Sequence, residues 1–115
     1  MVQGHIRGLS QYYVDGLERI EIWVPKSKAS SLPYKENIRV PIWLTICSNS
    51  YSAGLRSTTN NEYVWISPDL KDSKSKKVSL ARALIENGFK KSERIFLSVN
   101  GDVIHITHAS EEGDK

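Results

Sequence analysis

Residues 39–46 carry the pattern that most restricts the fold of this chain, because apolar side chains alternate there with other residues. One face of this segment would carry Val40, Ile42, Leu44 and Ile46. A period of two is the spacing of a β-strand with one buried face. Pro41 falls on the opposite face and cannot donate to a β-ladder. We therefore expect a strand at the edge of a sheet, or a bulge at Pro41.

Other segments repeat this strand character along the chain. In residues 17–24 the apolar side chains from Ile20 onward share one face. Residues 51–56 and 62–67 flank a polar run, which predicts a hairpin with a polar tip. Residues 94–99 and 102–107 flank Asn100-Gly101, a dipeptide that favours a two-residue type I′ turn.

One short helix is expected between the strands. Ser79 can cap a helix over residues 80–87, and Gly88 can end it in a left-handed conformation. Residues 25–37 and 68–77 are polar or charged and are predicted to be loops.

The chain of 115 residues is long enough for one modest core. We expect a mostly β (α+β) fold, a small pseudobarrel or β-barrel of about five to seven strands with one or two short helices. Residues 17–108 would form this single β-rich domain. Residues 1–16 would be a flexible N-terminal arm, and the acidic residues 109–115 a disordered tail.

Patterns that indicate catalysis are sparse. Glycine-rich phosphate loops are missing, and His105 and His108 would point to opposite faces of one strand. Pro68-Asp69 and Asp72-Ser-Lys74 resemble nuclease elements, but only two residues separate the aspartates. The sequence thus favours a protein that is not an enzyme by itself, with no cofactor and no metal site, although it could be the recognition domain of a nuclease.

The location expected for the chain is cytoplasmic, without a membrane partner. No stretch approaches the roughly 18 apolar residues of a membrane span. The N-terminus lacks the apolar region of a signal peptide. Cys47 is the single cysteine, so an internal disulfide is excluded.

Positive charge is concentrated in residues 71–94, which carry a net charge of +5, whereas the rest of the chain carries -2. The densest part is a lysine loop that holds Lys71, Lys74, Lys76 and Lys77. Such a loop suits phosphate contacts, since each contact releases counterions from a nucleic acid. A solvated surface loop is the alternative interpretation.

A second candidate segment, residues 48–61, is rich in hydroxyls and carboxamides, the groups that contact phosphates and base edges. Its candidate DNA-binding residues are Ser50, Tyr51, Arg56, Ser57, Thr58, Asn60 and Asn61. Arg56 could reach guanine, while Asn60 or Asn61 could pair with adenine. An ordinary polar hairpin tip is the alternative.

From Arg39 onward, the order of elements resembles the B3-like DNA-recognition pseudobarrels, including effector domains of some restriction endonucleases. The resemblance rests on the strand at 40–46, the polar arm at 48–61, the strand ending in Trp65-Ile-Ser67, the basic loop, the short helix and the closing hairpin. It implies that two arms grip the DNA major groove, the first at 48–61 and the second at 71–77. Residues 80–102 are also similar to the helix-plus-hairpin half of AbrB-type regulators, which dimerise and bind DNA.

The function predicted from these features is sequence-specific binding of duplex DNA, of the restriction-modification or regulatory type. The polar arm would read bases and the lysine loop would contact phosphates. The alternative is a protein-interaction module, an inhibitor or accessory subunit whose partner is a protein or a second copy of the chain. It would use an edge strand and the rings of Trp23 and Trp43, which lie opposite the apolar faces of their strands. Otherwise, these rings would lie in a second small core under the long loop of residues 25–37.

Overall fold

The structure is a computed structural model that describes residues 1–90 and 94–108. The tail expected at 109–115 lies outside the described residues. The elements are β1 (Val2–Tyr12), β2 (Glu18–Pro25), a 3-10 helix (Lys26–Lys28), β3 (Val40–Ile46), β4 (Asn49–Ser57), β5 (Tyr63–Ile66), β6 (Asp69–Lys71), β7 (Lys77–Ser79), α1 (Leu80–Glu86), β8 (Ile95–Asn100) and β9 (Val103–His108).

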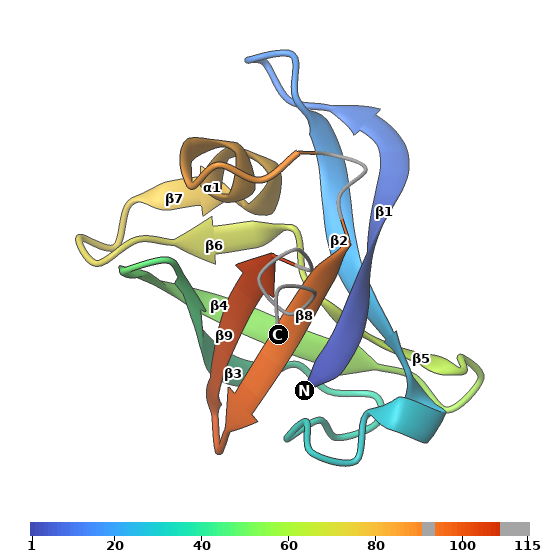
Figure 1. Ribbon diagram of the computed structural model, residues 1–115. Coiled ribbons are helices and arrows are strands. Elements are labelled where there is room, and N and C mark those ends of the chain that lie inside the picture. The colour runs from blue at the N-terminus through green and yellow to red at the C-terminus, as the bar shows by residue number, and fades with distance from the viewer. Residues whose placement is uncertain (91–93, 109–115) are drawn as a thin grey trace.

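Seven of the strands form a closed barrel (Figure 1). They are joined in the order β3-β9-β8-β1-β2-β5-β4, and pairing of β3 with β4 closes the ring. The β3–β9 pair is parallel, whereas the other pairs are antiparallel. The β6–β7 hairpin attaches to β4 outside the ring, at the pair Ser52 and Lys71. The prediction of a small, mostly β barrel with one or two short helices is confirmed.

The barrel interior is filled by the apolar faces of its strands. The side chains with the smallest exposure include Ile22, Leu44, Leu55, Ile104 and Ile106. Burial of a Leu or Ile side chain stabilises a fold by roughly 1.5–3 kcal/mol. The faces predicted from alternation in β2 and β3 are the faces that point inward, apart from Val40, which is only partly buried.

The first strand differs from the expected flexible arm at residues 1–16. Val2–Tyr12 form β1, which pairs with β2 on one side and β8 on the other. Gly4 is buried, and a Cβ on it would lie 2.9 Å from Cγ2 of Ile22. A strand that packs glycine against its neighbours carries few apolar side chains, so its sequence shows little alternation.

The prediction of an edge strand or a bulge at Pro41 was wrong, because β3 is paired on both sides and continuously with β4 from Val40 to Ile46. Pro41 is tolerated because pairing with β9 begins only at Trp43, whose N–H donates to the Asp102 carbonyl over 2.8 Å. The missing N–H of the proline therefore costs no ladder hydrogen bond to β9.

The structure changes the predictions for residues 68–77 and for the β8–β9 turn, and it confirms the predicted cap of α1. Residues 68–77 contain a hairpin, β6–β7, in place of a loop, and the Asp72 carboxylate accepts the N–H groups of Lys74 and Lys76 in its turn, each over 2.9 Å. In the β8–β9 hairpin the turn residues are Gly101 and Asp102, and positive φ at Gly101 alone fits a type II′ turn. Helix α1 is capped as predicted, since Oγ of Ser79 accepts from the Arg82 N–H over 3.0 Å.

Candidate functional site

A broad open groove of about 1610 Å³ runs along one side of the molecule. Its floor includes the outer face of β4, where Ser52 and Arg56 lie. The β6–β7 hairpin, α1 and the tip of the β1–β2 hairpin, residues 13–15, line further parts, together with residues of β1, β2 and β5. Figure 1 shows the β1–β2 tip and the β6–β7 turn as two projections, with α1 near the hairpin.

Two residues of the β1–β2 tip, Tyr13 and Asp15, make polar contacts with the rest of the groove. The Tyr13 hydroxyl donates to Oδ1 of Asp69 over 3.1 Å. The Arg82 guanidinium of α1 forms an ion pair with Asp15 at 2.9 Å. Partial burial, with the Asp69 charge and hydrogen bond in addition, raises the pKa of Tyr13 to about 12. The hydrogen bond from the Leu17 N–H and the contact with Arg82 lower the pKa of Asp15.

Basic side chains outnumber acidic ones in the groove lining, with seven against five. Two of the basic groups are paired, since Arg19 contacts Asp69 at 2.8 Å and Arg82 contacts Asp15. Among the residues that the structure describes, the other five have no ion-pair partner: Arg39, Arg56, Lys71, Lys76 and Lys77. The groove therefore presents an excess of uncompensated positive charge to solvent, an arrangement that attracts anions.

The strand register explains why these cations converge. Ser52 on β4 lies opposite Lys71 on β6, and Lys71 lies opposite Lys77 on β7. Arg56 projects from the same outer face of β4, since residues at even positions alternate with the buried Tyr51, Ala53, Leu55 and Ser57. One basic surface thus spans β4, β6 and β7.

The structure brings together part of the predicted DNA-binding set. Arg56, Lys71, Lys76 and Lys77 all line the groove. Ser50 is exposed on the outer face of β4, and Lys74 is exposed in the β6–β7 turn, but neither lines the groove. Tyr51 and Ser57 face the barrel interior, where Tyr51 accepts a hydrogen bond from the Asn87 carboxamide over 3.2 Å.

The predicted residues Thr58, Asn60 and Asn61 lie apart from the groove, at the β4–β5 tip. This tip and the β6–β7 turn occupy opposite sides of the molecule in Figure 1. Asn60 and Thr58 are exposed, and the Asn61 carboxamide accepts the N–H of Tyr63 over 2.9 Å.

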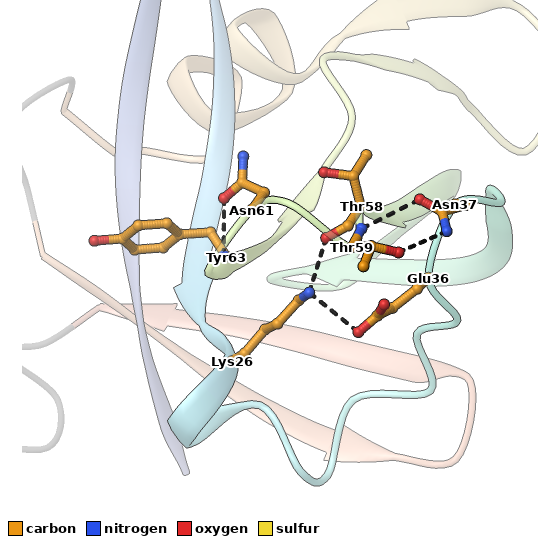
Figure 2. A network of polar contacts seen from close by, with 7 residues as sticks. All are labelled: Lys26, Glu36, Asn37, Thr58, Thr59, Asn61 and Tyr63. Carbon is orange, nitrogen blue, oxygen red and sulfur yellow. Dashed lines mark hydrogen bonds and ion pairs between the residues drawn. The ribbon is translucent and has the colours of Figure 1, made fainter.

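Figure 2 shows that the tip is joined to the long loop by a polar network. Nζ of Lys26 contacts Glu36 at 3.2 Å and donates to the Thr58 carbonyl over 2.8 Å. The Asn37 carboxamide donates to Oγ1 of Thr59 over 2.8 Å and accepts the Thr59 N–H over 3.2 Å. The hydrogen bond from Lys26 lowers the pKa of Glu36. These contacts give the tip an evident structural role.

The tryptophans do not share one environment. Trp23 stacks on Trp65 with ring centroids 5.6 Å apart, and the Arg7 guanidinium lies 4.3 Å above its ring. Trp65 is the cross-strand neighbour of Arg56 and lines the groove. Trp43 is 51% exposed beside Val103 of β9. The expected second core under the long loop therefore does not cover Trp43.

Sequence reasoning did not select Arg39, Arg82 or the β1–β2 tip. Arg39 shares the outward alternation of Pro41 and Trp43, which was a usable signal. Arg39 lies beside β4 because β3 and β4 form a hairpin. Nothing local, however, places Tyr13 beside Asp69, because that contact depends on the order of strands in the barrel.

No family model, curated protein or solved structure matches this chain, so similarity to known proteins does not indicate what the groove binds. Within residues 1–90 and 94–108, no group of three His, Cys, Asp or Glu side chains is arranged to hold a metal ion. The same part of the chain has no helix long and apolar enough to cross a membrane.

Proposed function

We propose that this protein binds duplex DNA in a sequence-dependent way through the basic groove. The observation that carries the proposal is the convergence of Arg39, Arg56, Lys71, Lys76 and Lys77 without ion-pair partners among the described residues. A regular polyanion would neutralise these charges and release its counterions. The B3-like resemblance adds an analogy with the same partner.

The two projections beside the groove support a duplex as the ligand. The β1–β2 tip presents exposed Tyr12 and Val14, while the β6–β7 turn presents Lys74 and Lys76. A surface with two projections and a charged floor suits a helical polyanion, with phosphates on the floor and base edges near a projection. In this proposal the β1–β2 tip takes the place of the β4–β5 tip as the first arm.

The test is binding of a labelled duplex with a randomised centre at about 50 mM salt, where phosphate contacts are strong. Each of Lys71→Ala and Lys77→Ala should weaken binding and reduce the salt slope by about 0.9, the value for one lost phosphate contact. Lys28→Ala is the matched control, because Lys28 is exposed on the 3-10 helix and does not line the groove. Absence of duplex binding by the unmodified protein would refute the proposal.

Exposed Trp43 favours a second candidate function, binding of a protein partner. Trp43 and its neighbour Val103 are both exposed on the outer face of the barrel, and aromatic anchors of this kind dominate many protein interfaces. In that case Trp43→Ala would abolish partner capture or self-association, whereas Lys77→Ala would leave it unchanged. The reverse result would favour DNA.

A further inference from the structure

One side chain of the groove, Arg39, packs against a glycine. A Cβ atom on Gly54 would lie 2.7 Å from Cζ and 2.9 Å from Nη2 of Arg39, and would overlap its Nε. The Arg39 guanidinium therefore lies directly against the backbone of β4 at Gly54. Any Cβ atom at position 54 would require the Arg39 guanidinium to move away from this position.

The glycine is not required by the backbone itself. The positive φ values among glycines belong to Gly16, Gly88 and Gly101, so Gly54 has an ordinary strand conformation. Glycine inside a strand weakens it and commonly marks the close approach of another group. At Gly54 the group that approaches is the Arg39 guanidinium.

The hydrogen-bonding groups of Arg39 are left for a ligand. Within residues 1–90 and 94–108, Arg39 has no ion pair and no hydrogen bond, although its planar guanidinium carries five N–H donors. Arg39 lines the groove, and Arg56 projects from the same strand face two positions beyond Gly54. A guanidinium without a hydrogen-bond or ion-pair partner among the described residues thus lies beside the place where the proposed DNA would bind.

We propose that Arg39 reads a guanine base in the bound duplex and that Gly54 is its positioning residue. This inference rests on the proposed DNA-binding function. A phosphate contact needs charge in roughly the right place, and a flexible lysine supplies it. Recognition of O6 and N7 of guanine needs a planar guanidinium in a suitable orientation, and packing against Gly54 limits the orientations open to Arg39.

The experiment is selection from a duplex pool with a randomised centre, followed by sequencing of the duplexes captured by each variant. Arg39→Lys keeps the positive charge but removes the planar guanidinium. Gly54→Ala keeps Arg39 but displaces its guanidinium. Both should lose guanine enrichment at one position, with a roughly tenfold to hundredfold loss of discrimination there. Lys28→Ala, which lies outside the groove, should retain the unmodified pattern.

The outcomes separate the inference from the function on which it rests. If the unmodified protein captures no duplex, the proposed function fails and the inference fails with it. If it captures duplexes but Arg39→Lys keeps every guanine preference, DNA binding stands and base reading by Arg39 is refuted. Capture without any base preference refutes both the inference and the sequence dependence of the proposed function. Should Gly54→Ala fail to fold by circular dichroism, the surface variant Arg39→Lys still decides the result.

Discussion

Lys71 and Lys77 face each other as direct cross-strand neighbours in the β6–β7 hairpin. Like charges in this relationship destabilise a sheet. Neither lysine has an ion-pair partner among the described residues, so no ion pair offsets the cost of this arrangement. An anionic ligand in the groove would remove that cost.

Lys77→Glu should therefore increase the stability of the fold and weaken its binding to DNA. An opposite-charge pair with Lys71 should increase the free energy of unfolding by about 0.2–1 kcal/mol relative to the lysine pair. Duplex binding should weaken roughly tenfold, because a phosphate contact becomes a repulsion. Urea unfolding and fluorescence anisotropy measure the two effects, and Lys28→Glu is the control for net charge. Unchanged duplex affinity would contradict a role for this lysine pair.

Ser57→Ala should leave DNA binding unchanged and stabilise the fold. Ser57 is 2% exposed, and its Oγ has no hydrogen-bond partner among the described residues. Removal of a buried, unpaired hydroxyl should increase the free energy of unfolding by about 1 kcal/mol. Urea unfolding tests this expectation. A loss of stability would mean that a bound water satisfies the hydroxyl.

The fold was largely predictable because alternation is a local property. β2 and β3 show it directly, and Ser79 and Gly88 mark the ends of α1. The sequence did not predict β1, because its glycines make sense only once their close contacts with β2 and β8 are known.

The candidate site was predictable only in part, because some of its residues are close in the sequence and others meet only in the folded chain. The lysines of residues 71–77 form a cluster in the sequence, so composition identified them. Composition also selected Asn60 and Asn61, which lie away from the groove. Arg39 joins the groove through the pairing of β3 with β4, and the β1–β2 tip joins it through contacts with Asp69 and Arg82.

Tyr13→Phe should alter the response to alkaline pH. The pKa of Tyr13 is raised to about 12 in the folded protein from an ordinary value of 10.0. Its neutral form therefore stabilises the fold below pH 10, and this contribution is lost as the pH rises from about 10 through 12. Relative to Tyr13→Phe, the unmodified protein should lose stability in that window, as measured by urea unfolding at several pH values. A constant difference between the two proteins across the window would rule out the raised pKa.

Asn37→Ala should weaken the fold without affecting duplex binding. Asn37 has a positive φ of 68°, which asparagine tolerates better than alanine, and its carboxamide makes both hydrogen bonds to Thr59. Loss of these bonds together with the strain should lower the free energy of unfolding by about 1–3 kcal/mol. Asn37→Gly, which relieves the strain but not the lost bonds, should fall between the two proteins. Duplex affinity should stay unchanged in both variants, since the β4–β5 tip lies outside the groove. Weaker binding by folded Asn37→Ala would indicate that the tip contacts DNA.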